Sequence, residues 1–93
     1  MIIGSLSVHL SIPEARSLKD KRAVLRSMKD RARNRMNISV AEVGRQNEWK
    51  FAELAFVTVA SESKAVQQRL SKLMTFVRSE PRCVVTHMET EMG

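Results

Sequence analysis

Residues 49–60 read WKFAELAFVTVA, and this stretch decides which fold the chain can adopt. In an extended strand, Leu54 and Phe56 point to one face, whereas Val57 and Val59 point to the other. A strand that is apolar on both faces usually lies inside a sheet, or has its second face covered by a partner. We therefore predict that residues 49–60 form a central strand.

In the rest of the chain, the spacing of apolar residues switches between two patterns. A period of two predicts strands, and apolar residues spaced by three or four predict helices. Pro13 ends the first strand because it cannot donate to a sheet ladder, and Ser17 is the expected N-cap of the first helix. The predicted elements are a strand over 2–12, a helix over 18–35, a strand over 38–43, a turn over 44–47, the strand over 49–60, a helix capped by Ser61 or Ser63, and a last strand over 83–92.

The order β-α-β-β-α-β fits a four-stranded antiparallel sheet with both helices on one face and two right-handed crossovers. This is the ferredoxin-like arrangement of the α+β class, in which the first and third strands are central. The sequence predicts a single ferredoxin-like domain over residues 1–93. Such domains bind RNA, metals, amino acids or one another, so the fold alone assigns no function.

Composition argues against several classes of protein. No apolar run reaches the length of about 18 residues that a membrane-spanning helix needs, so no membrane partner is expected. Residues 1–5 lack the basic start of a secretion signal, and the single Cys83 cannot form an internal disulfide. We therefore expect a cytoplasmic protein.

Positive charge is concentrated in one segment. Nine of the sixteen Lys and Arg residues lie between Arg16 and Arg35, where only Asp20 and Asp30 oppose them. A local positive field attracts polyanions, and nucleic acid is the commonest polyanion in a cell. We expect the nine cations to form an RNA-binding surface: Arg16, Lys19, Lys21, Arg22, Arg26, Lys29, Arg31, Arg33 and Arg35.

Five of these cations form what we call the basic stripe: Lys19, Arg22, Arg26, Lys29 and Arg33. At roughly 100° per residue, they occupy a band about 80° wide on the predicted helix. Their Cβ atoms would be about 5–6 Å apart, which resembles the spacing of phosphates along a strand. The alternative is a solvated helix face without a ligand, although a surface built for solubility usually mixes both signs.

Two charged residues fall in predicted core elements. Lys21 lies within the apolar side of the helix, where we expect its methylenes to follow apolar surface while its ammonium reaches water. Glu42 is expected to pair with a nearby arginine or to face water at a sheet edge. Neither Glu42 nor Glu53 has a second group at a spacing suited to acid–base chemistry, so we predict no catalytic residue and no enzymatic activity.

The sheet face away from the helices is predicted to be polar on the first strand. RNA-recognition domains of this topology stack bases on aromatic residues of the two central strands. Here the first strand presents Ser5, Ser7, His9 and Ser11, and the chain has no tyrosine, so the sheet face is a poor stacking platform and RNA is expected on the helix side. The third strand presents Ala55, Val57 and Val59 on that face, which makes it a possible dimer face. Trp49 and Arg45 are possible interaction residues, although tryptophan is more often a core anchor.

Histidine and cysteine give only a weak metal signal. His9 and His87 would be neighbours if the last strand pairs with the first, and Cys83 is expected on the same strand face as His87. Their spacing matches no zinc motif. We therefore expect no metal, no cofactor and no small-molecule substrate.

Two segments, SLKDKR over 17–22 and NISVAEVG over 37–44, resemble the YlxP-like family of small bacterial proteins, a domain of unknown function. The resemblance covers nearly the whole chain and implies a ferredoxin-like fold without established catalytic residues. Members are often encoded beside transcription-termination, translation-initiation and ribosome-maturation factors, which implies a role in ribosome biogenesis or translation. Arg45 departs from the pattern, because the turn there more often carries His or Asp.

The sequence therefore predicts a small cytoplasmic protein that binds RNA, with ribosomal RNA or its precursor as the expected partner. The alternative is a protein-interaction module that forms a homodimer through the open sheet face or docks onto an acidic partner.

Overall fold

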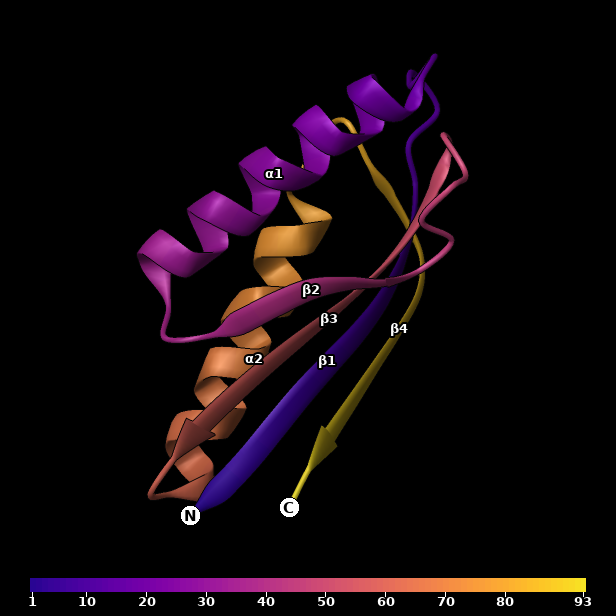
Figure 1. The fold of residues 1–93 in the computed structure, drawn as a ribbon. Helices are drawn as coiled ribbons and strands as arrows, with labels where there is room; N and C mark the ends of the chain where they lie inside the picture. The colour runs from indigo at the N-terminus through magenta and orange to yellow at the C-terminus, as the bar shows by residue number, and fades with distance from the viewer.

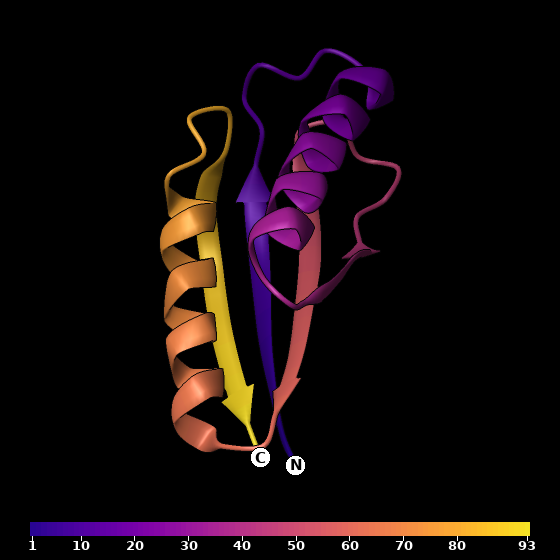
Figure 2. The same ribbon diagram turned by 90° about the vertical axis from the view of Figure 1, so that its left-hand side faces the viewer.

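The computed structural model describes all of residues 1–93 and contains four strands and two helices. In chain order these are β1 (Ile2–Ser11), α1 (Leu18–Arg35), β2 (Ser39–Gly44), β3 (Phe51–Ala60), α2 (Ser63–Arg78) and β4 (Val84–Met92). The strands form one antiparallel sheet in the order β2-β3-β1-β4. Both helices cover the same face of the sheet (Figure 1, Figure 2). The predicted ferredoxin-like arrangement is confirmed.

The ends of the four strands differ from the prediction by one or two residues, and the predicted cap of α2 also differs. β3 begins at Phe51, because Trp49 and Lys50 belong to the bend that precedes it. The prediction that Ser61 or Ser63 caps α2 is wrong, since Glu62 is the N-cap residue and its side chain makes no capping hydrogen bond. Ser17 does cap α1, where its hydroxyl accepts a hydrogen bond from the Asp20 amide at 3.1 Å.

The hydrophobic core lies between the helices and the inner strands. Alternate residues of β1 and β3 point toward the helices, and each helix contributes one buried stripe. The buried set includes Leu6, Val8 and Leu10 of β1, Ala52, Leu54 and Phe56 of β3, Leu25, Met28 and Ala32 of α1, and Val66, Leu73 and Val77 of α2.

Gly4 allows α2 to approach β1 closely. A Cβ atom at this position would collide with a methyl group of Val66, and Leu70 lies directly beside it. Val66 is fully buried, so it has little room to move away. This close approach brings α2 onto β1, while α1 lies toward the β2 edge of the sheet (Figure 2).

The second face of the sheet has no helix over it. Both chain termini lie at one end of the sheet, the end at which α2 begins (Figure 1). Neither helix is long and apolar enough to cross a membrane.

Candidate nucleic-acid interface

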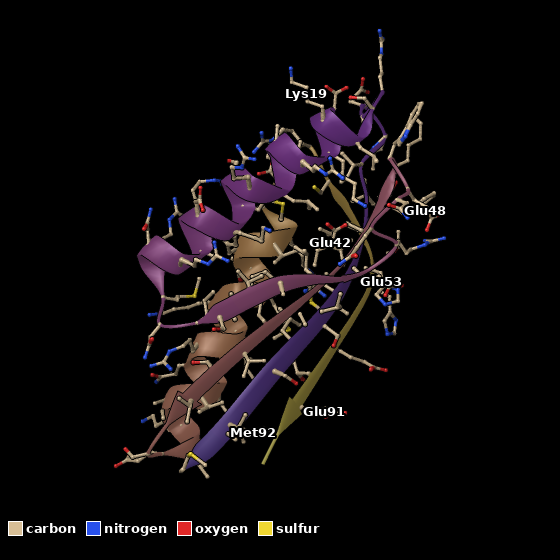
Figure 3. All side chains as sticks on the ribbon, viewed as in Figure 1. Lys19, Glu42, Glu48, Glu53, Glu91 and Met92 are labelled. Atoms are coloured by element: carbon tan, nitrogen blue, oxygen red, sulfur yellow. The ribbon has the colours of Figure 1, made fainter.

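The basic stripe lies along the flank of α1 that faces the edge strand β2. Lys19, Arg22 and Arg26 are exposed, and Lys29 is partly buried. None of these four side chains makes an ion pair within the protein, although ion pairs are found elsewhere on the molecule. Figure 3 shows Lys19 at the N-terminal end of α1, pointing away from the sheet. The four ammonium and guanidinium groups are therefore free to meet an external anion.

A shallow groove of about 380 Å³ separates the stripe from β2. Its walls carry four cations of the stripe, two carboxylates and one buried aliphatic side chain. The lining residues are Arg22, Leu25, Arg26, Lys29, Asp30, Arg33 and Glu42. Cations outnumber acids two to one in this groove, so its field favours an anionic ligand.

Lys21 is not part of the exposed surface, which corrects two expectations. Its side chain is 1% exposed, and its ammonium lies 2.8 Å from the carboxylate of Glu42. The same ammonium donates hydrogen bonds to the carbonyl oxygens of Arg45, at 2.7 Å, and Glu48, at 2.8 Å. The charge is therefore held inside instead of reaching water, and Lys21 cannot contact phosphate. Glu42 pairs with this lysine and not with an arginine.

The Lys21 ammonium holds the turn between β2 and β3 by hydrogen bonds to two of its carbonyl oxygens. Arg45 has a φ of 56°, the left-handed conformation that a non-glycine residue rarely adopts. Its carbonyl is fixed by Lys21, and its guanidinium packs 4.5 Å from the ring centre of Phe51 and 2.8 Å from the Glu48 carboxylate. Trp49 follows in the same turn and is 50% exposed, so it is not a core anchor.

Arg33 is the member of the stripe whose guanidinium contacts acceptors within the protein. One of its guanidinium nitrogens lies 3.5 Å from the Asp30 carboxylate, and another donates to the Val40 carbonyl oxygen at 3.3 Å. In the same way, the Gln46 amide donates to the Glu42 carbonyl oxygen at 3.1 Å. The bonds to Val40 and Glu42 are both accepted by carbonyl oxygens of β2, an edge strand with a neighbouring strand on one side only.

Arg31 lies on the flank of α1 opposite to the basic stripe, where it pairs with a buried carboxylate. It forms an ion pair with Glu80, whose side chain is 2% exposed, and its guanidinium packs 5.4 Å from the ring centre of Phe76. Arg82 completes the cluster, with a guanidinium nitrogen 2.9 Å from the Glu80 carboxylate. Arg31 is therefore paired within the protein and does not belong to the set of free cations on α1.

The remaining two cations of the segment sit at its ends. Arg16 is exposed, and its side chain makes no ion pair. Arg35 is exposed, with its guanidinium 5.5 Å from the ring centre of Phe76. The structure thus separates the nine predicted residues into one that is buried, two that are partly exposed and paired with carboxylates, and six without a carboxylate partner.

Three pKa values are shifted in the region where α2 leads into β4, and that of Arg82 is raised by its hydrogen bond to Glu80. The side chain of Arg82 donates to Glu80 and, with help from Arg31, lowers the pKa of that carboxyl to about 2 despite its burial. The thiol of Cys83 is buried next to the Met28 sulfur, and the loss of hydration raises its pKa to about 11. Cys83 is therefore a thiol of low reactivity near neutral pH.

The open face carries the predicted dimer residues. Val57 and Val59 are 43% and 45% exposed, Ala55 is partly buried, and Ile3 is 44% exposed beside Val59 in the β1–β3 register. Glu53 and Glu91 also lie on the side of the sheet away from α1 (Figure 3).

The expected pairing of His9 with His87 is confirmed, with ring centres 5.2 Å apart. Their nearest carboxylates are those of Glu53, 3.9 Å from His9, and Glu89, 3.5 Å from His87. The expectation that Cys83 shares the His87 face is wrong, because its sulfur is buried against α1. No three His, Cys, Asp or Glu side chains are grouped so that they could hold a metal ion.

Comparison with known structures defines the class of protein. The chain superimposes on the de novo designed protein LFR1 1, described as having a ferredoxin fold, with a TM-score of 0.58 and 10% identity over 98% of this chain and 86% of that one. It also superimposes on the designed protein Foldit4 with a TM-score of 0.56 and 6% identity, over 100% and 97% of the two chains. At these identities the likeness concerns the fold alone, which is that of a small ferredoxin-like domain.

Comparison of sequences then gives the family. Residues 3–90 match the family described as "Protein of unknown function (DUF503)". The chain is also 32% identical over 90 residues to "Uncharacterized protein YlxP" of Bacillus subtilis (strain 168), which covers 97% of this chain and 98% of that protein. The chain belongs to the DUF503 family, and the predicted YlxP-like resemblance is confirmed.

The two internal charge clusters explain which site predictions failed. Lys21 and Glu42 lie 21 residues apart in sequence, and Arg31 and Glu80 lie 49 apart. The one local signal for the first cluster is the position of Lys21 on the apolar side of the helix, where a buried charge requires a partner. Glu80 precedes Pro81 in a loop, and no pattern around it indicates burial.

We predict that Lys21→Met destabilises the fold by about 3 kcal/mol, because it leaves the Glu42 carboxylate and two carbonyl oxygens without their donor. Urea unfolding would measure the loss. Lys21→Met combined with Glu42→Gln should recover part of it, since the uncompensated carboxylate is removed. Equal stability of Lys21→Met and the parent protein would contradict the role assigned to this ion pair.

We also predict an acid-dependent loss of stability that originates at Glu80. Because its folded pKa is lowered from 4.5 to about 2, its contribution is complete above pH 4.5 and is lost as the pH falls toward 2. The shift corresponds to about 3 kcal/mol. Free energies of unfolding measured across this range should converge for the parent and Glu80→Gln at low pH. Glu62→Gln is the control, because Glu62 is exposed and makes no ion pair.

Proposed function

We propose that this protein binds RNA in the cytoplasm through the basic stripe of α1, as a non-enzymatic accessory factor in ribosome biogenesis or translation. The observation that carries the proposal is the set of free cations on one helix flank. Lys19, Arg22, Arg26 and Lys29 have no carboxylate partner in the protein, although the chain has ten acidic residues.

The spacing of the four cations suits a phosphate backbone. Successive members are three or four residues apart, which places their Cβ atoms about 5–6 Å from one another. Each side chain is long enough to reach a separate phosphate, and arginine can hold two oxygens of one phosphate at once. Arg16 and Arg35 extend the positive surface beyond both ends of the stripe.

The groove between the stripe and β2 supports the same ligand chemistry. Its two acids do not cancel its cations, because Glu42 is neutralised by Lys21 and Asp30 lies 3.5 Å from Arg33. Arg22, Arg26 and Lys29 therefore retain their full charge at the groove. Ribosomal RNA or its precursor is the proposed partner, in agreement with the genes that accompany the YlxP-like family.

A second candidate function is homodimerisation through the open sheet face. The observation that favours it is the row of apolar side chains that no helix covers: Ile3, Val57 and Val59 are each between 43% and 45% exposed. Burying such a row against a second copy would remove apolar surface from water. Trp49, which is half-exposed, is a further possible contact for a partner.

We predict that reversing Arg22 and Arg26 to Glu lowers affinity for ribosomal RNA by roughly 100-fold, since two phosphate contacts are replaced by repulsion. Filter binding at low and physiological salt would measure the change, and thermal unfolding would show that the fold is retained. The matched control is Lys64→Glu with Arg78→Glu, which reverses two exposed cations of α2. If both double variants bind equally well, the stripe is not the RNA site.

For the dimer, we predict that Val57→Lys shifts sedimentation toward the monomer, because a charge would be buried in the contact. Val84→Lys is the control, since Val84 is 55% exposed at the opposite end of the sheet, paired with Ser11. A parent protein that sediments as a strict monomer at high concentration would remove this candidate.

A further inference from the structure

We infer that the basic stripe takes base-paired RNA, holding its sugar–phosphate backbone without reading its bases. The inference rests on the proposed RNA-binding function and specifies the form of the RNA. Three features of the surface lead to it: the fixed positions of the cations, a groove without aromatic residues, and an acid on the outermost side of α1.

The cations project from a helix whose position is fixed at two points. Lys21 attaches the first turns of α1 to β2 and the β2–β3 turn, and Arg31 attaches its last turns to Glu80. At 1.5 Å per residue, the row from Lys19 to Lys29 is about 15 Å long. A fixed row loses little entropy when it meets phosphates that are also held in place, as they are in a duplex.

No aromatic residue lines the groove between the stripe and β2. Phe56 is buried, and Phe76 is nearly buried between α2 and the guanidinium groups of Arg31 and Arg35. Phe51 packs under Arg45, and Trp49 belongs to the β2–β3 turn. Proteins that hold single strands stack unpaired bases on aromatic side chains, and the groove offers none.

An acidic residue lies on the side of α1 that points away from the sheet. Asp30 is exposed there, and its carboxylate lies 3.5 Å from Arg33 of the stripe. A helix that reads bases enters a groove with its outermost side, and this carboxylate would then meet the negative field of the nucleic acid. Arg22, Arg26 and Lys29 line the groove beside β2, so they meet a backbone from the flank of α1. A-form duplexes are recognised in this manner, by shape and by backbone contacts and not by sequence.

The test compares two RNAs with equal numbers of phosphates: a blunt duplex of about 16 base pairs, a length that shape-reading RNA domains span, and an unpaired pyrimidine strand twice as long. Fluorescence anisotropy would be measured for the parent, Arg22→Glu with Arg26→Glu, Lys64→Glu with Arg78→Glu, and Trp49→Ala. We expect the parent to bind the duplex about 10-fold more tightly than the strand, since only the duplex presents its phosphates in place. A duplex of scrambled sequence should bind equally well, and Trp49→Ala should bind the duplex as the parent does.

The outcomes separate the inference from the proposed function. Equal or tighter binding of the single strand, lost in the Arg22→Glu, Arg26→Glu variant, would overturn the inference and leave RNA binding by the stripe intact. A marked loss of duplex affinity in Trp49→Ala would also overturn it, because a base would then be stacking on the indole. Failure to bind either RNA would remove the proposed function itself.

Discussion

One buried ammonium group determines how the first helix meets the sheet. A lysine charge can remain inside a protein only when its donors are satisfied, and Lys21 finds a carboxylate and two carbonyl oxygens within 2.8 Å. These acceptors come from β2 and from the turn that follows it, so helix, edge strand and turn share one electrostatic anchor. With Lys21 directed inward, the helical repeat directs Arg22, Arg26 and Lys29 over the β2 edge.

The cations of α1 divide into those that build the fold and those that remain free. Lys21 lies within the buried stripe of α1 and Arg31 lies on its flank, and these two residues pair with the carboxylates of Glu42 in β2 and Glu80 in the loop before β4. The stripe beyond them then has few acids left to neutralise it. The stripe is therefore positive for two reasons: the segment contains many basic residues, and the nearby carboxylates of Glu42 and Glu80 are paired with Lys21 and Arg31.

Hydrophobic periodicity was sufficient to predict the six elements, their order and the layer arrangement, because burial of one face is a local property of each segment. The wide apolarity of residues 49–60 correctly placed β3 inside the sheet. Pairings between distant charges could not be predicted, since nothing near Lys21 in the sequence indicates Glu42. The sulfur of Cys83 was misplaced because it precedes β4, where the chain has not yet taken up strand alternation.

The hydrogen bonds from Arg33 and Gln46 to the carbonyls of β2 have a consequence for how the molecule behaves in a crowded cell. An outer strand with unsatisfied carbonyls is a template for recruiting strands of other chains, the first step of aggregation. Here two such acceptors are already occupied by side chains of the same molecule. At the opposite edge, the exposed carboxylates of Glu89 and Glu91 would repel a second β4. A sheet whose two edge strands are occupied or charged in this way is a poor template for strands of other chains.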